Sequence, residues 1–265
     1  MEQRYIIPNL SKVCDLLGFL AAQPEGVTSA QIEKSLDIPK TTAFRILRTL
    51  CAGGIAAKQG SLYFAGSRLI RIGLQALNGI ELRELSVPVL RDVTEETQLT
   101  SHIAVLSGAK SLILEVCDSP GPVRVASRAG TLVDLHCSST GKVFLAFQLR
   151  HKLDELLSGN PEGRTSHTLT DPQAIRAEIE AVFRRGYACD DEEYHNGVRC
   201  VAAPVYDLNG SVTAALGITG TCGDIPVERI DPLGRTVIEA AGNLSRSLGY
   251  KEQPMLIKVG VNCKL

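Results

Sequence analysis

Apolar positions recur at helical spacing in three short segments at the start of the chain. The first segment predicts a helix that begins after an Asn9 cap and buries Leu10, Val13, Cys14, Leu17 and Leu20. In the second, Thr28 and Gln31 have the spacing of a capping box, which predicts a helix over about 29–35. The third is expected to open with Pro39 and to bury Ala43, Ile46, Leu47 and Leu50. Residues 55–64 then read as two short strands that turn at Gln59-Gly60.

Two short helices, a tight turn between them and a following hairpin are the arrangement of a winged helix-turn-helix. Charge supports this interpretation, because residues 39–71 carry six Lys or Arg and no acid, although the whole chain has a net charge of -1. Double-stranded DNA is therefore the expected partner. The alternative is a three-helix packing module with a solvated basic face. The residues expected to contact DNA are Lys40, Thr41, Thr42, Phe44, Arg45 and Arg48 in the helix, and Lys58 and Ser61 in the wing.

The next segment predicts a helical connector. Helical spacing runs through residues 67–77 and resumes over about 81–98, and Asn78-Gly79 is the expected domain boundary. Pro88 is expected to kink the second of these helices or to mark a new start. The apolar faces of these two helices favour a connector or a dimer interface. The alternative is that the helices simply pack onto the rest of the chain.

Beyond residue 100 the period of the apolar positions becomes that of strands, with helices between them. Strands are expected over 102–106, 111–117, 123–127, 187–190, 198–206 and 212–219, the last two flanking Asn209-Gly210. Helices are expected over 138–148, over 151–157, from Asp171-Pro172 to Gly186, and after an Asp231-Pro232 cap. Antiparallel hairpins interspersed with helices indicate an α+β body.

Composition excludes several classes of protein. The 265 residues are 44% hydrophobic and 22% charged, which is typical of a globular chain, and no apolar run approaches the length of a membrane span. The eight cysteines form no C-x-x-C pair, so we expect reduced thiols in a cytoplasmic protein.

Two segments of the second half of the chain contain candidate chemistry, residues 128–142 and residues 186–193 with 197–204. The acids of the second segment could instead form a solvated turn, and its Cys200 could be a buried thiol. Small hydroxyl residues from Ser138 open a helix whose free N–H groups would favour an anion, and the alternative is that Ser138 is an ordinary N-cap. A competing hypothesis is an enzyme that uses Cys200 or Cys137 with His136, or a metal site that also includes Cys189. The absence of close Cys/His ligand spacing and the basic N-terminal pattern disfavour this hypothesis, so neither metal nor cofactor is expected.

Several motifs together resemble the IclR-type bacterial transcription regulators over residues 9–249. They are Ile38–Arg45, Leu135-His136 with Thr140–Lys142, Gly186-Tyr187 with Asp190–Glu193, Gly197–Pro204 and Ala214–Gly220. The resemblance implies a winged helix-turn-helix domain (1–66), a helical linker and the start of the effector domain (67–98), a GAF-like effector domain with an antiparallel sheet (99–250), and a tail (251–265). It also implies a homodimer or tetramer that binds a palindromic operator and responds to a small organic or sugar acid.

The resemblance further implies an effector site. The family's positions fall on the backbone amides of Ser139 and Thr140 and on the side chains of Asp190, Cys200, Gly217 and Thr219. Gly217 stands where some members have a serine, and it is expected to leave room for a longer sugar acid or an aromatic acid. Arg124 or Arg128 is a candidate for supplying positive charge. The protein is therefore expected to be a ligand-responsive, non-catalytic repressor or activator.

Overall fold

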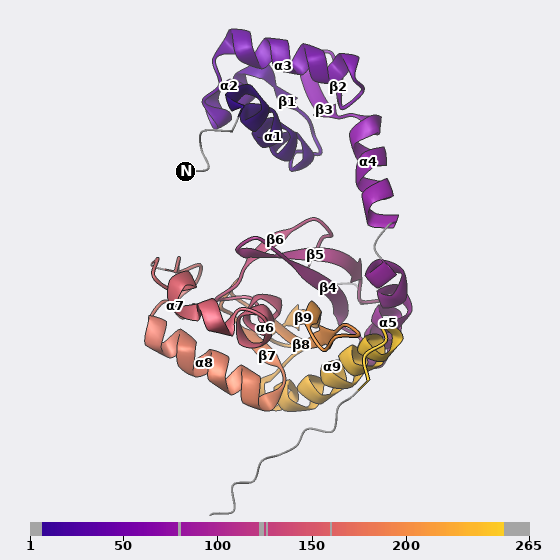
Figure 1. Ribbon diagram of the computed structural model, residues 1–265, viewed down its shortest axis with the longest axis vertical. Coiled ribbons are helices and arrows are strands. Elements are labelled where there is room, and N and C mark those ends of the chain that lie inside the picture. The colour runs from indigo at the N-terminus through magenta and orange to yellow at the C-terminus, as the bar shows by residue number, and fades with distance from the viewer. Residues whose placement is uncertain (1–6, 79–80, 122–124, 126, 160, 252–265) are drawn as a thin grey trace, which may run out of the picture. The chain divides into compact units, whose positions relative to one another are not determined.

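The computed structural model describes residues 7–78, 81–121, 125, 127–159 and 161–251 (Figure 1). The chain divides into two compact units, residues 1–80 and 81–265. The helix predicted over 67–77 ends the first unit, and the helix predicted over 81–98 begins the second. The predicted boundary at Asn78-Gly79 includes residue 79, which lies outside the described residues, as does the tail from residue 252.

The N-terminal unit packs helices around a small antiparallel sheet with the strand order β1-β3-β2. Its elements are α1 (Pro8–Ala21), β1 (Val27–Thr28), α2 (Ser29–Leu36), α3 (Lys40–Ala52), β2 (Ala56–Gln59), β3 (Leu62–Ala65) and α4 (Ser67–Asn78). Leu16, Leu20, Ile32 and Leu47 form the centre of its core, against which Tyr63 of β3 packs. The winged helix-turn-helix arrangement predicted for residues 28–64 is confirmed.

Local sequence determines where these helices begin. The Thr28–Gln31 capping box is present, and the backbone N–H of Thr28 donates to Gln31 Oε1 at 2.8 Å. Pro39, expected inside the third helix, is its N-cap instead. The predicted Asn9 cap is wrong, because Pro8 already occupies the first turn of α1, where its missing N–H costs nothing. The buried face of α1 is consequently shifted, with Leu16 buried and Leu10 56% exposed.

The second unit is an α+β domain, as predicted. Its helices are α5 (Glu81–Thr97), α6 (Ser139–Phe147), α7 (Leu153–Leu156), which follows a 3-10 turn (Arg150–Lys152), α8 (Pro172–Arg185) and α9 (Val227–Ser247). Its strands are β4 (Thr100–Ser107), β5 (Lys110–Cys117), β6 (Leu132–Asp134), β7 (Ala188–Asp191), β8 (Val198–Tyr206) and β9 (Val212–Thr221). Within the described residues these strands form one antiparallel sheet of order β6-β5-β4-β9-β8-β7.

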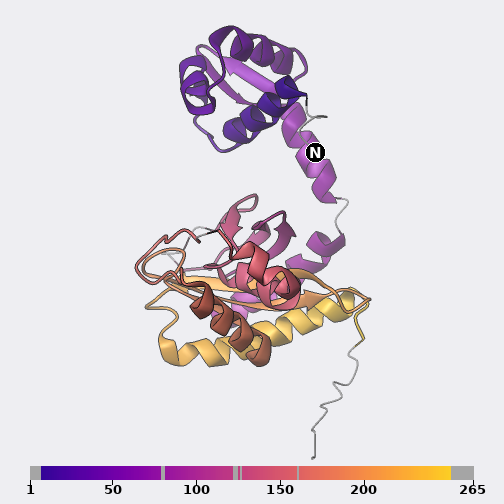
Figure 2. The same ribbon diagram turned by 60° about the vertical axis from the view of Figure 1, so that its left-hand side comes forward.

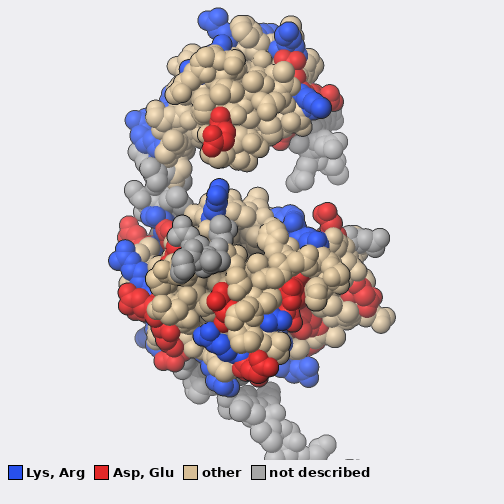
Figure 3. All heavy atoms as spheres, turned by 180° about the vertical axis from the view of Figure 1, so that it is seen from behind, with Lys and Arg blue, Asp and Glu red and all other residues tan. Residues whose placement is uncertain are grey.

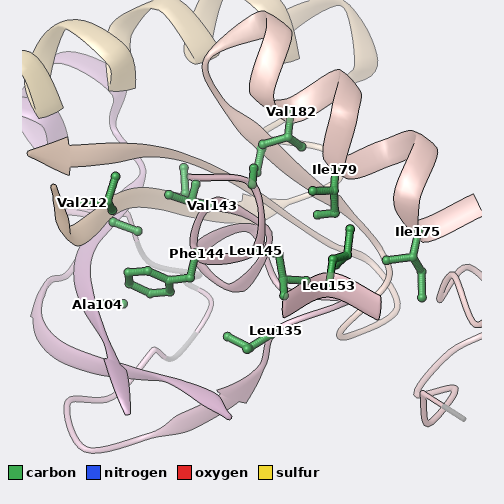
Figure 4. Packing of buried hydrophobic residues seen from close by; sticks show 14 of the residues in the cluster. Ala104, Leu135, Val143, Phe144, Leu145, Leu153, Ile175, Ile179, Val182 and Val212 are labelled. Atoms are coloured by element: carbon green, nitrogen blue, oxygen red, sulfur yellow. The ribbon is translucent and has the colours of Figure 1, made fainter. Parts of the chain in front are cut away.

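Helices cover both faces of this sheet. Helices α5 and α9 contact each other and the central strands, and α6 packs on the opposite face together with α8 (Figure 2). The core on the α6 side is shown in Figure 4, where Phe144 and Leu145 of α6 lie among Ile179 of α8, Leu153 of α7 and Ala104 of β4. Small residues on the strands let α6 approach the sheet closely, because Ala104, Ala188, Ala202 and Ala215 belong to the same buried cluster.

Two prolines lie inside helices: α5 has no new start at Pro88, and the predicted cap at Asp231-Pro232 is wrong. Helix α5 continues through Pro88, and α9 begins at Val227, so Pro232 is inside the helix instead of at its start. Both prolines are exposed, and water can satisfy the carbonyl that each leaves without an N–H partner. The strand predicted over 123–127 is also wrong where it is described, since residues 125 and 127 are not in a strand, and β6 lies later, at Leu132–Asp134.

Candidate functional site

The exposed face of α3 carries the polar side chains that the sequence singled out. Lys40, Thr41, Arg45 and Arg48 are exposed, while Ala43, Ile46, Leu47 and Leu50 hold the opposite face in the core. Phe44 is 53% exposed, and the Arg48 guanidinium lies 5.9 Å from the centre of its ring. A large aromatic side chain on a polar helix face is available for contact with an apolar group of a partner, such as a thymine methyl.

Not every hydroxyl of this helix is available. Thr49 donates its hydroxyl to the carbonyl of Arg45 at 2.9 Å. Thr42 is half-buried and lines a groove toward α1 together with Arg45. The hydroxyl most open to a partner is therefore that of Thr41.

The wing brings two further predicted residues to the surface. Lys58 on β2 and Ser61 in the turn are both exposed. The ammonium group of Lys58 lies 5.3 Å from the ring centre of Tyr63, its cross-strand partner, which holds the long side chain over the hairpin. On the face of the C-terminal unit drawn in Figure 3, acidic and basic side chains are interspersed.

A cavity of about 120 Å³ lies in the C-terminal unit, between the sheet and the start of α6. Strand register assembles its floor, because Asp190, Cys200 and Thr219 are cross-strand partners in one row of β7, β8 and β9. Ser139 and Thr140 of α6 line the same cavity. Five of the six residues predicted for the effector site are therefore brought together, although they come from distant parts of the chain.

The first turn of α6 presents hydrogen-bond donors to the cavity. Ser138 caps the helix by accepting from the Gly141 N–H at 3.2 Å. Within the described part of the chain, no acceptor pairs with the backbone N–H of Ser139 or Thr140. Ser138 is therefore an N-cap, and this does not exclude the predicted anion site, since a capped helix still leaves its first N–H groups without an acceptor.

Close packing explains the rest of the Thr140–Lys142 motif. A Cβ on Gly141 would lie 2.4 Å from Leu135 Cα and 2.6 Å from the carbonyl oxygen of Asp134, so only glycine permits α6 to begin here. The Lys142 side chain is buried, forms an ion pair with Glu193 and donates to the carbonyl of Cys189 at 2.9 Å. The helix start is thereby fixed to β7 and to the loop after it.

Asp190 is buried at the floor of the cavity. One of its carboxylate oxygens accepts from the backbone N–H groups of Glu193, at 2.8 Å, and Tyr194, at 3.1 Å. Burial nevertheless raises the pKa of Asp190 to about 7, so the carboxyl group changes charge near neutral pH. The alternative that these acids form a solvated turn is wrong for Asp190 and Glu193, which are both buried.

The thiol of Cys200 is hydrogen-bonded to its cross-strand partner, Thr219. It donates to the hydroxyl oxygen of Thr219 at 3.1 Å. Burial raises the pKa of this thiol well above its ordinary value, so the sulfur stays protonated and is a poor nucleophile.

Gly217 does not leave the room that the sequence predicted. A Cβ at this position would lie 2.7 Å from Nε2 of His102 and 3.2 Å from the Cβ of Ala202, and Gly217 does not line the cavity. The imidazole of His102, directly across from Gly217 on β4, fills the space and lines the cavity instead. The expectation of extra space for a longer ligand is therefore wrong.

Sequence reasoning also missed other parts of the cavity wall. Tyr194 and Thr131 line it, together with His102, and Arg128, one of the two candidate cations, is exposed at the same cavity. Arg124 lies outside the described residues. A histidine within an apolar strand was the available signal for His102, but only the register of β4 against β9 reveals its partner.

The geometry does not support the enzyme hypothesis. Burial raises the pKa of Cys137 and of Cys189 to about 12, and His136 Nε2 pairs with the carbonyl of Glu162 at 3.0 Å. The described residues contain no group of three His, Cys, Asp or Glu that could hold a metal ion. They also contain no helix that is long and apolar enough to span a membrane.

Comparison with known families gives matches in both units. Residues 9–60 match the IclR helix-turn-helix domain, and residues 74–246 match the domain described as bacterial transcriptional regulator IclR C-terminal. The HTH-type transcriptional regulator BhcR of Paracoccus denitrificans is 33% identical over 242 residues, which cover 89% of this chain and 85% of BhcR.

Solved structures are similar over nearly the whole chain. The crystal structure of Thermotoga maritima IclR superposes with a TM-score of 0.73 at 28% identity, covering 92% of this chain and 99% of that one. An IclR homologue from Microbacterium hydrocarbonoxydans, complexed with 4-hydroxybenzoate, has a TM-score of 0.79 at 24% identity, covering 91% and 98%. BhcR and the transcriptional repressor IclR of Escherichia coli, which is 27% identical over 248 residues, are named as regulators and not as enzymes, which agrees with the expectation of a non-catalytic protein.

Proposed function

The chain belongs to the IclR family of bacterial transcriptional regulators, and from this premise we propose that a small organic or sugar acid controls its binding to a palindromic operator. The helix-turn-helix domain binds DNA. Three points are our proposal beyond the family membership: the symmetry of the operator, the acid that binds, and a dimeric or tetrameric assembly.

The DNA-binding roles that we propose follow the exposed residues of the N-terminal unit. Arg45 and Arg48 reach base edges in the major groove, where a guanidinium can make two hydrogen bonds to guanine. Lys40 and Thr41, at the start of α3, contact phosphate or base edges, and Phe44 contacts a thymine methyl.

The wing has a different role. Lys58 and Ser61 contact the DNA backbone, so they add affinity but little sequence information. Thr42 has the smallest role, because it is half-buried.

The effector role that we propose rests on one observation above all. The free N–H groups of Ser139 and Thr140 belong to residues that line a cavity, and Asp190, Cys200 and Thr219 are among the other polar residues of its wall. Such a helix start favours a carboxylate, and Thr219 can donate to or accept from a second polar group. Asp190 accepts from a ligand hydroxyl or is protonated when the acid binds. That a homologue of the same fold was solved with 4-hydroxybenzoate supports the choice of an organic acid.

The mechanism is a shift of population. An acid that binds one arrangement of the protein more tightly than another changes the fraction that can occupy the operator. The effect on DNA affinity cannot exceed the difference in the acid's affinity for the two arrangements.

A thermal-shift screen against small carboxylic and sugar acids tests this proposal. A ligand that binds only the folded state must raise the melting temperature by mass action. Acids that do so are then added to operator-binding assays with the protein's own promoter region. A protein that no acid stabilises, or whose operator affinity no stabilising acid changes, would contradict the proposed control.

A further inference from the structure

The imidazole of His102 occupies an unusual position for a polar group. Its side chain is 4% exposed, and among the described residues nothing pairs with Nδ1. A buried polar atom without a partner is unfavourable, and native proteins seldom keep one. Nδ1 itself is covered, but the ring forms part of the cavity wall, so a turn of the ring exposes this nitrogen to a ligand that can supply the missing partner.

Gly217 is the residue that makes this position possible. It is the cross-strand partner of His102, and any side chain at residue 217 would collide with the imidazole, at 2.7 Å from Nε2 and 3.0 Å from Cε1. The glycine and the histidine thus work as a pair. Where a serine at residue 217 would have offered a hydroxyl, the pair offers an imidazole from the neighbouring strand.

We propose that His102 is a specificity-determining residue of the effector site, and that it hydrogen-bonds a second polar group of a hydroxylated monocarboxylic acid. This inference rests on the proposed function, since it assumes that an acid binds at the start of α6.

The charge state of His102 restricts the ligand class. Burial lowers the pKa of His102 to about 4, so the ring is neutral at physiological pH and has one donor and one acceptor. A neutral imidazole can hydrogen-bond a hydroxyl or carbonyl group, but it has no positive charge to compensate the negative charge of a second carboxylate. Asp190, in the same cavity, disfavours a second anion further, because burial raises its pKa only to about 7 and it carries negative charge above that pH. Dicarboxylic acids are therefore expected to be excluded.

Matched pairs of acids test the contact by isothermal titration of the full-length protein. The probes are lactate with propionate, 4-hydroxybenzoate with benzoate, and succinate as the dicarboxylate. The wild type is expected to prefer the hydroxylated member of a pair that it binds by about tenfold, the value of one hydrogen bond, and to reject succinate. His102→Phe, which keeps a ring but removes both nitrogens, is expected to reduce this preference to less than about twofold.

Two further variants and a control complete the test. His102→Gln keeps a donor and an acceptor and is expected to retain part of the preference, whereas Gly217→Ala displaces the ring and is expected to weaken it. His151→Phe makes the same chemical change at an exposed position in the 3-10 turn and is expected to have no effect. Thermal unfolding identifies which variants are folded. If His102→Phe does not fold, the preference of Gly217→Ala for the hydroxylated acid tests the role of His102 instead.

The outcomes separate this inference from the proposed function. A wild type that binds both members of every pair equally, or a folded His102→Phe that keeps the preference, overturns the role of His102 alone. A wild type that binds none of the acids overturns the proposed effector site and the role of His102 with it.

Discussion

Lys142 is a charged side chain in the interior of the C-terminal unit, and its surroundings explain how it is tolerated. Its ammonium group pairs with Glu193, donates to the Cys189 carbonyl at 2.9 Å and lies 3.9 Å from a carboxylate oxygen of Glu178. Removal of one member of a buried pair leaves the other charge without compensation. We therefore expect Lys142→Met to lower the free energy of unfolding by about 3 to 5 kcal/mol, measured by urea denaturation.

A matched control is available at the protein surface. Lys110 also pairs with a carboxylate, that of Asp134, but its side chain is 46% exposed. Lys110→Met is expected to cost about 0 to 1 kcal/mol. The double variant Lys142→Met/Glu193→Gln should recover part of the loss, because no buried charge is then left unpaired. Equal effects of the two lysine substitutions would contradict the role given to the buried pair.

His102 also predicts a pH dependence of stability. The pKa of its imidazole is about 4 in the folded protein and near 6.5 when exposed, so between these values only the unfolded chain binds the proton. Acid therefore favours unfolding, and the contribution of His102 is complete above pH 6.5 and lost as the pH falls toward 4. Relative to His102→Phe, the wild type should lose up to about 3 kcal/mol over this range.

The measurement is urea denaturation of both proteins at pH 7.5 and at pH 4.5. Other groups, including Asp190, titrate in both proteins and cancel in the difference. Parallel losses of stability in the two proteins would show that His102 is solvated and protonated in the folded state.

At the scale of elements, the features predicted correctly from the sequence are helix starts and ends that depend on residues within one turn. The Thr28–Gln31 capping box, the Asp171 cap of α8 and the Gly186 end of that helix each depend on contacts within one turn, and all three are present. The prolines were misread because their effect depends on exposure. Pro88 and Pro232 are on solvent-facing sides of long helices whose apolar faces pack into the domain, and that burial outweighs a lost backbone hydrogen bond.

The cavity was predictable only in part, for a related reason. The helix start at Ser138 is a local feature and was identified from its residue types. The His102–Gly217 pair arises from the register between β4 and β9, which lie far apart in the sequence, and a shift of β4 by one residue would turn His102 to the other face of the sheet. From residue types alone, the glycine at position 217 suggested extra room for a ligand.

Helix α3 and the wing should contribute to DNA binding in different ways. Arg45→Ala should weaken binding to the specific operator by about 1 to 3 kcal/mol if the guanidinium reads a base edge. Lys58→Ala should weaken binding to all sequences alike and reduce the salt dependence, because a phosphate contact releases a counterion. Binding curves at two salt concentrations, for operator and for unrelated DNA, distinguish the two effects. If neither change alters affinity for the promoter region, the assigned roles are wrong.

At the scale of the whole molecule, the two proposed kinds of recognition belong to different units of the chain. The N-terminal unit carries exposed basic residues, and the C-terminal unit contains a cavity with several polar residues in its wall, with a separate core in each unit. Substitutions at the cavity should therefore leave the folded N-terminal unit and its intrinsic DNA contacts intact. An acid can influence the operator only through arrangements of the protein that it binds with different affinity.

Assembly is the last property that we predict at this scale. One winged helix covers one half-site, so specific binding to a long operator requires at least two protomers. Helix α4 carries two exposed apolar side chains, Ile70 (55% exposed) and Ile72 (47% exposed), on different sides of the helix, and we expect a partner protomer to cover them. Light scattering at micromolar concentration should show a dimer or tetramer, and footprinting should show two inverted half-sites about one helical turn, or a multiple of it, apart. Replacing both isoleucines with Asp should shift the protein toward monomers and weaken operator binding more than binding to a single half-site. A monomeric wild type with a single unrepeated footprint would contradict the prediction, because two-fold protein symmetry and a repeated DNA site imply each other.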